Sequence, residues 1–198
     1  MGSDRREQVV PGIFKVYVNI PLDKLEILMN DGGRVLKEIE NRTQTKISVD
    51  SINGYAVIEP ASSKAPVTSV IKAQEILKAI SIGFPLDRVW RLLNEDQVLI
   101  IINLKEIVGD ASNHLTRVKG RIIGEGGKVR RNIEEMTGTY ISVHDDYIGI
   151  IGDYEYANIA REAIEMLIQG RQHSTVYRYL DRSIHELKRR RSVDLWIK

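Results

Sequence analysis

The sequence has no cysteine among its 198 residues, which excludes a disulfide framework, a thiolate metal site and a cysteine nucleophile. It has only four histidines and no H-E-x-x-H spacing, so neither a zinc enzyme nor any other metal or cofactor site is expected. No apolar run approaches the roughly 20 residues of a membrane span, and the polar residues 1–7 are unlike a signal peptide. These absences predict a soluble intracellular protein that does not enter a membrane.

Hydrophobic residues make up 42% of the chain, which is ample for a folded core. At roughly 100–200 residues per domain, the length allows one domain or two small ones. The formal net charge is only +2, so any strongly basic surface must come from local clustering of charge.

An internal repeat indicates two small domains rather than one. Residues 28–49 align without a gap onto residues 122–143, and ten of the 22 positions are identical. Two further pairs, Asp31/Glu125 and Arg34/Lys128, keep their charge. Such similarity favours two domains of one ancestry over two amphipathic helices that merely look alike.

Both copies predict the same order of elements, β-α-α-β-β-α, from the alternation and spacing of their apolar residues. In the first copy we expect strands at 13–20, 46–49 and 55–58 and helices at 22–29, 34–42 and 67–80. In the second we expect a strand at 98–102 or 106–108, strands at 140–143 and 148–151, and helices at 114–123, 129–136 and 156–168. Residues 83–93 predict a partly helical connector, which is too apolar for a flexible linker, so the domains are expected to pack together.

A glycine-rich turn, Gly124–Gly127, falls between two predicted helices of the second copy. Glycine allows close approach of a ligand and positive φ, and a helix N-terminus attracts phosphate. A Walker loop would need Ser or Thr after Lys128, and a dinucleotide fingerprint would need a third glycine there, but Val129 occupies that position. A purely steric helical turn remains as the alternative.

The segment 122–143 resembles the centre of a type I KH domain. The matching features are the apolar pair before the GXXG turn, the basic helix after it, the Thr-Gly turn and the following strand. The GXXG loop of such a domain clamps about four nucleotides of single-stranded nucleic acid. The resemblance therefore implies an α+β fold of two tandem type I KH domains packed together, followed by a basic C-terminal helix.

Carried over by position, the resemblance implies that the loop and its basic flanks hold the RNA backbone, above an apolar bed. The expected backbone contacts are Gly124, Glu125, Gly126, Gly127, Lys128, Arg117, Lys119, Arg121, Arg130 and Arg131. The expected apolar bed is Ile122, Ile123, Val129 and parts of Ile141–Val143, including Val143.

The first copy departs from this pattern, because Asn30 replaces the first glycine and Asp31 places a carboxylate in the turn. Over residues 115–131 six basic residues oppose one acidic residue, for a net +5, whereas residues 21–37 are balanced at zero. Since phosphate binding scales with the number of basic contacts, the second copy is predicted to bind RNA. The first is expected to bind protein or to support the second.

The C-terminal segment 173–191 predicts a helix with an apolar stripe and many basic residues. Arg178 and Arg182 lie on one face and are expected to extend the RNA-binding surface; a merely solvated face is the alternative. The compact cluster at His144 falls in a predicted turn, and it supports neither a metal site nor an enzyme.

The arrangement as a whole is similar to the archaeal and eukaryotic pre-ribosomal family called partner of Nob, or Dim-two. Further marks of resemblance are residues 83–93 and 121–124. The expected domains are a first, degenerate KH domain at 10–82, a connector at 83–97, a second KH domain at 98–170, and a basic helix and tail at 171–198.

This resemblance implies a non-catalytic cytoplasmic adaptor that binds the 3′ end of small-subunit rRNA. It would present that RNA to a processing endonuclease and to the rRNA dimethyladenosine transferase. The alternatives are a general KH protein acting on mRNA or in an RNA-degrading complex, and a nuclease that uses His144.

Overall fold

The computed structural model describes residues 14–62 and 64–196. The chain divides into two compact units, Met1–Lys78 and Ala79–Lys198, and the division falls within the helix α2 (Val67–Ser81). The predicted first domain begins at residue 10, and its residues 10–13 lie outside the described part. No helix in the described ranges is both long and apolar enough to cross a bilayer.

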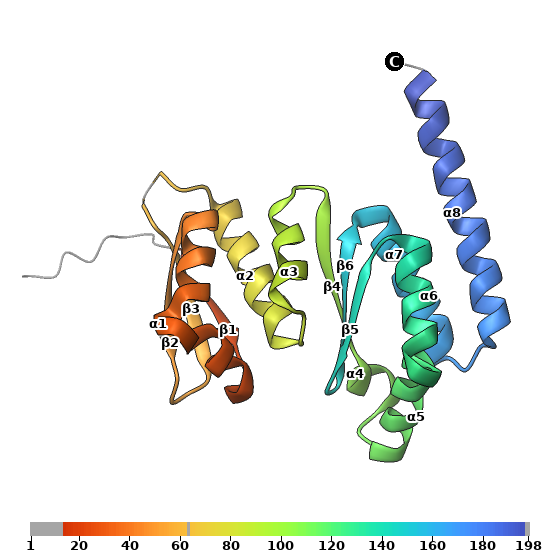
Figure 1. Cartoon of the computed structure of the whole chain (residues 1–198), viewed down its shortest axis with the longest axis horizontal. Coiled ribbons are helices and arrows are strands. Elements are labelled where there is room, and N and C mark those ends of the chain that lie inside the picture. Colours follow the sequence, from red (N-terminus) through yellow and green to blue (C-terminus); the bar gives the residue numbers. More distant parts are fainter. Residues whose placement is uncertain (1–13, 63, 197–198) are drawn as a thin grey trace, which may run out of the picture. The chain divides into compact units, whose positions relative to one another are not determined.

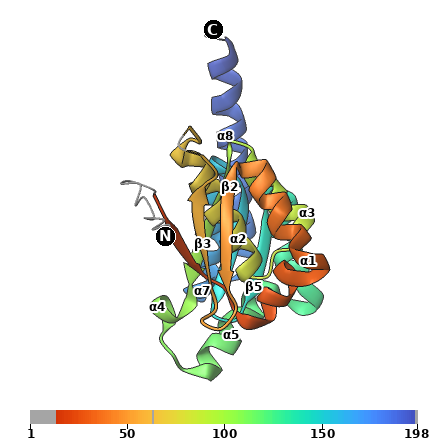
Figure 2. The same cartoon turned by 90° about the vertical axis from the view of Figure 1, so that its left-hand side faces the viewer.

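The first unit contains a three-stranded antiparallel sheet in the order β1-β3-β2 (Figures 1 and 2). Its elements are β1 (Val16–Asn19), α1 (Leu22–Thr43), β2 (Thr45–Asp50), β3 (Tyr55–Pro60) and most of α2. The helix α1 is interrupted at Asn30–Gly33, which separates the two helices that the sequence predicts. Apolar residues at helical and strand spacing, among them Leu28, Ile39 and Ile58, are fully buried.

The second unit has a matching antiparallel sheet in the order β4-β6-β5. Its strands are β4 (Gln97–Asn103), β5 (Tyr140–His144) and β6 (Tyr147–Asp153). Its helices are α3 (Leu86–Val89), η1 (Trp90–Leu93), α4 (Leu104–Val108), α5 (Ser112–Ile123), η2 (Glu125–Gly127), α6 (Lys128–Thr137), α7 (Tyr154–Ile168) and α8 (His173–Trp196). Helices α5 to α8 and the sheet share one apolar core, which includes Ile133, Ile148 and Ile164.

Ile82, just before the connector, and Phe84, at its start, lie against the other face of this sheet. Successive side chains of a strand face opposite sides of the sheet. The neighbours Ile148 and Ile150 belong to the core, so a side chain at Gly149 in β6 would face away from the helices. A Cβ atom on Gly149 would lie 2.4 Å from Ile82 and 2.5 Å from Phe84, so only glycine lets these side chains pack flat against the strand.

The repeat is preserved down to single hydrogen bonds. The Thr43 hydroxyl donates to the carbonyl of Ile39 at 2.7 Å, and the Thr137 hydroxyl donates to the carbonyl of Ile133 at 2.6 Å. Each of these threonines also shares a hydrogen bond with the threonine two residues later, at 2.7 Å and 2.8 Å.

The two units also join their second helix to the edge strand in the same way. In each unit, a glutamate in the helix after the glycine turn accepts a backbone N–H from the strand that follows, at 2.7 Å. Glu40 in α1 accepts from Ile47 in β2, and Glu134 in α6 accepts from Ile141 in β5. All of these pairs are related by the 94-residue offset found in the sequence, so the two units have the same architecture.

The predicted helices and strands are confirmed in type, with ends that shift by up to three residues, except that α8 ends five residues beyond the predicted end at 191. The strand at 98–102 is confirmed by β4, while the alternative at 106–108 is wrong, because these residues belong to α4. Asn103 caps that short helix by accepting the N–H of Lys105, and Leu104 is fully buried. The connector is partly helical, as predicted, and the basic C-terminal helix extends to Trp196.

Candidate nucleic-acid interface

The second glycine loop, Gly124–Gly127, joins α5 to α6 through positive φ angles at three glycines. Gly124 has φ 72° and ψ 174°, a region open in practice only to glycine. A Cβ atom on Gly124 would lie 2.3 Å from Cγ2 of Val129, too close for any side chain. In contrast, a Cβ atom on Gly126 would meet nothing within 4 Å. The loop therefore needs glycine at 124 for its shape, and it has open space at its tip.

The first turn of α6, which follows this loop, is suited to an anion. Its N-cap residue is Gly127, which has no side chain to accept the N–H groups of that turn, and the turn contains no acidic residue. Free N–H groups at a helix N-terminus and the positive end of the dipole attract phosphate. Lys128, the first residue of α6, is exposed beside them, as is the loop residue Glu125.

The basic residues predicted for this site differ in what they contact. Arg117 and Arg131 are exposed, and Arg131 reaches the loop, since its Nη1 atom lies 3.1 Å from the Cβ position of Gly127. Lys119 donates to the carbonyl of Asp145 at 3.0 Å, which ties α5 to the turn between β5 and β6. Arg130 lies 3.8 Å from Glu134, one turn further along α6.

Arg121 has a structural partner. Its Nε atom donates to the carbonyl of Leu167 at 3.2 Å, and its Nη2 atom donates to the carbonyl of Arg171 at 2.6 Å. The carbonyl of Arg121 itself lies 3.2 Å from Nε2 of His173. The Arg121 side chain therefore fastens the end of α5 to the α7–α8 turn, a role that the sequence analysis did not foresee.

The predicted apolar bed requires a correction. Ile122 is fully buried in the core, Ile141 is 1% exposed and Val129 is 8% exposed, so these side chains have little or no surface for a base. Ile122 lies with Leu115 and Val118 on the side of α5 that faces the core, not in the groove that the sequence analysis expected. Only Ile123 and Val143 keep a partly exposed apolar surface.

The C-terminal helix α8 packs firmly on the domain. Val176, Leu180 and Ile184 belong to its core, while Arg178 and Arg182 are exposed. Burial raises the pKa of Tyr179 to about 12, and its hydroxyl also donates a hydrogen bond to Glu162.

Further along α8, Arg191 is held by acidic partners. It forms ion pairs with Asp153 at 2.9 Å and with Glu155 at 2.6 Å, which raise its pKa. It also lies over the ring of Tyr156. The charge of Arg191 is therefore neutralised by carboxylates of the same unit, whereas Arg178 and Arg182 lie exposed nearer the start of α8.

The first loop, Asn30–Gly33, has a different shape. Asn30 has φ −57° where Gly124 has φ 72°, and positive φ angles occur instead at Asp31, Gly32 and Gly33. The exposed Asp31 also adds a negative charge to the turn. The first unit therefore has Asn30 where the second has Gly124, and the backbone φ differs at the same position.

His144 lies 3.5 Å from Asp145, and the neighbouring Asp146 is paired with Lys105 at 2.7 Å. Within the described ranges, no group of three or more His, Asp or Glu side chains is arranged to hold a metal ion.

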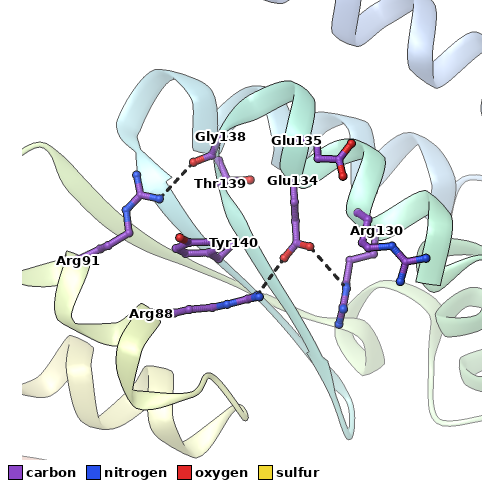
Figure 3. Close-up of a pocket in the computed structure, with 9 residues that line it drawn as sticks. Arg88, Arg91, Arg130, Glu134, Glu135, Gly138, Thr139 and Tyr140 are labelled. Atoms are coloured by element: carbon purple, nitrogen blue, oxygen red, sulfur yellow. Dashed lines mark hydrogen bonds and ion pairs between the residues drawn. The ribbon is translucent and has the colours of Figure 1, made fainter. Parts of the chain in front are cut away.

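The structure also reveals a basic pocket that the sequence analysis missed, which we call the arginine pocket (Figure 3). It has a volume of about 490 Å³ and lies among the connector, α6 and the start of β5. Its charged and aromatic lining comprises Arg88, Arg91, Arg130, Arg131, Glu134, Glu135 and Tyr140. The sequence signal for this pocket is the pair Arg88 and Arg91, three residues apart in the largely apolar connector.

These features define a KH-domain protein. Residues 98–185 match the family described as eukaryotic type KH domain, KH-domain type I. The match extends beyond α7 into α8, which agrees with the packing of α8 on the core.

Relatives extend the similarity to nearly the whole chain. A KH domain-containing protein of Methanocaldococcus jannaschii is 35% identical over 181 residues, which cover 91% of this chain and 78% of the relative. A crystal structure of a protein of unknown function from Aeropyrum pernix is 49% identical, with a TM-score of 0.90, and covers 94% of this chain and 98% of that one. In the complex of a/eIF2alpha, aDim2p and rRNA from Pyrococcus horikoshii, the matching chain is 42% identical, with a TM-score of 0.81, covering 88% and 96%.

The chain belongs to the PNO1/Dim2 family of KH-domain proteins. It spans about half the length of the pre-rRNA-processing protein PNO1 of Saccharomyces cerevisiae, 54%, at 32% identity.

Proposed function

We propose that this protein is a non-catalytic adaptor in small-subunit ribosome biogenesis that binds single-stranded RNA through the second glycine loop. Both units are KH domains in this proposal, and the first has lost its RNA-binding loop. The RNA is the 3′ end of small-subunit rRNA, which the protein presents to a processing endonuclease and to the rRNA dimethyladenosine transferase.

The observation that carries the proposal is the geometry of the loop. Gly124 permits a backbone shape that leads into the N-terminus of α6, which has no side-chain cap, and Lys128 and Arg131 lie beside it. Backbone N–H groups and cations placed together in this way bind phosphate groups. Related proteins support the nature of the RNA, since the P. horikoshii relative is described in a complex with rRNA and the yeast relative is named for pre-rRNA processing.

The contrast between the two glycine turns supports a division of labour, in which the second unit binds RNA and the first does not. In the first unit Asn30 gives the turn a different backbone, and Asp31 places a carboxylate where a phosphate would approach. The basic excess of residues 115–131 is absent from residues 21–37. We propose that the first unit contacts protein or supports the second.

The test uses matched changes at the two loops. Glu125→Asp combined with Gly126→Asp places a new carboxylate at the tip, where the backbone is left-handed and a Cβ atom meets nothing within 4 Å. Aspartate tolerates such a backbone, so the fold should persist. Gly32→Asp is the matched control, because Gly32 is also left-handed with open space around it.

We expect the double variant to lose at least about tenfold in affinity for a pyrimidine-rich RNA from the 3′ end of the rRNA, because like charges now face each other. The control should bind as the unchanged protein does. Equal losses in both would contradict the division of labour, and no loss in either would refute the proposed site. Equal affinity of the unchanged protein for a scrambled RNA would favour the alternative, a general KH protein.

A further inference from the structure

The arginine pocket contains more positive charge than its own carboxylates neutralise. Four arginines and two glutamates line it. Glu134 serves three groups at once: Arg88 at 3.3 Å, Arg130 at 3.8 Å and the N–H of Ile141 at 2.7 Å. One carboxylate shared in this way leaves part of the surrounding positive charge available to another anion.

Arg91 shows this excess most clearly. Its Nη1 atom donates to the carbonyl of Gly138 at 3.4 Å, and its guanidinium lies 5.0 Å from the ring centroid of Tyr140. Both partners are uncharged. Arg88 lies 4.5 Å from the centroid of the same ring, so two guanidinium groups that line the pocket contact Tyr140 (Figure 3).

The pocket continues from the second glycine loop. Arg131 lines the pocket and also lies beside Gly127 in the loop. The ten residues of α6 run from the loop to the far end of the pocket at Gly138, a length of about 15 Å. A KH loop holds about four nucleotides, so a longer strand that follows α6 reaches the two arginines of the connector.

We propose that the arginine pocket binds a backbone phosphate of the same RNA strand, beyond the nucleotides held by the second glycine loop. The phosphate is held by Arg91 and Arg88, with Tyr140 keeping the two guanidinium groups in place. This inference rests on the proposed function. It adds residues of the connector, which lie outside the matched segment 98–185, to the RNA-binding surface.

The test compares RNAs of two lengths, four and ten nucleotides, cut from the same pyrimidine-rich sequence and titrated against the full chain. Arg91→Gln is the test variant, because the partners of Arg91 in the described part of the chain, the carbonyl of Gly138 and the ring of Tyr140, are uncharged. Arg34→Gln is the matched control, since it removes one exposed charge from the first unit. Arg91→Lys retains the charge, and a thermal unfolding curve for each variant checks the fold.

One lost phosphate contact lowers the salt slope for a single strand by about 0.7, which corresponds to about fourfold in affinity at about 0.15 M salt. We expect Arg91→Gln to lose about fourfold for the ten-nucleotide RNA and nothing for the four-nucleotide RNA. Arg91→Lys should keep the salt slope, and Arg34→Gln should change neither RNA.

Three results would overturn the inference. The first is an unchanged affinity and salt slope for the longer RNA with Arg91→Gln, and the second is an equal loss for both lengths. The third is that Arg91→Gln weakens the binding of inorganic phosphate or of a polyglutamate peptide while RNA binding stays the same, which would assign the pocket to a free anion or to an acidic protein. The proposed function fails separately, if the double aspartate variant at Glu125 and Gly126 leaves binding of the four-nucleotide RNA intact.

Discussion

Replacing Gly124 by alanine should destabilise the second unit far more than replacing Gly126 by alanine, although both glycines lie in one loop. At Gly124 the backbone region costs a residue with a Cβ about 1–3 kcal/mol. The overlap of that Cβ with Val129, at 2.3 Å from Cγ2, displaces a side chain packed at the edge of the core, which costs about another 1–3 kcal/mol. We therefore expect Gly124→Ala to lower the free energy of unfolding by about 2–6 kcal/mol.

Gly126→Ala is the control for this comparison. Its φ of 55° lies in the left-handed region, but no atom stands within 4 Å of the new Cβ. The cost is then only that of the left-handed backbone, about 1–2 kcal/mol.

Urea unfolding followed by tryptophan fluorescence measures both variants. Both tryptophans of the chain, Trp90 and Trp196, fall within the range of the second unit, and Trp90 in η1 reports the unfolding of that unit. Equal destabilisation by the two substitutions would refute the loop geometry, because the reasoning depends on Val129 lying against Gly124 and on open space at Gly126.

Three further outcomes are expected. Changing Arg178 and Arg182 to glutamate should weaken RNA binding and reduce its salt slope by about 1 or more; an unchanged slope would leave both residues as a solvated face. Thr43→Val and Thr137→Val should each cost about 1–3 kcal/mol, because each leaves the hydroxyl of the neighbouring buried threonine without its partner; a large cost at only one site would argue against equivalent turns. The raised pKa of Tyr179 means that the folded state keeps its proton after the unfolded state has lost it, so stability should be level below pH 10 and should fall between pH 10 and about 12. Tyr179→Phe should make that fall smaller in urea unfolding curves, and an identical pH profile would contradict the shift.

The sequence predicted the element order well, because the apolar residues follow clear helical and strand periods in both copies. The 94-residue offset in the sequence matches the hydrogen bonds that Thr43, Thr137, Glu40 and Glu134 make in the structure. Where one segment had two possible strands, the sequence could not decide. The cap at Asn103 and the burial of Leu104 explain why 104–108 is helical.

The site was predicted less completely, since sequence shows neither burial nor contacts between distant segments. Ile122 was placed in the groove, but its side chain faces the core. Arg121 was counted as an RNA contact, although it is bonded to two carbonyls at the α7–α8 turn. Arg88 and Arg91 could not be connected with Tyr140 before the fold brought the connector against β5.

Ultraviolet crosslinking of the full chain to the pyrimidine-rich rRNA fragment, with mass spectrometry of the crosslinked peptides, tests the location of RNA most directly. We expect crosslinks within residues 112–144, which contain α5, the second glycine loop, α6 and β5. Crosslinks confined to residues 14–60 of the first unit would contradict the account.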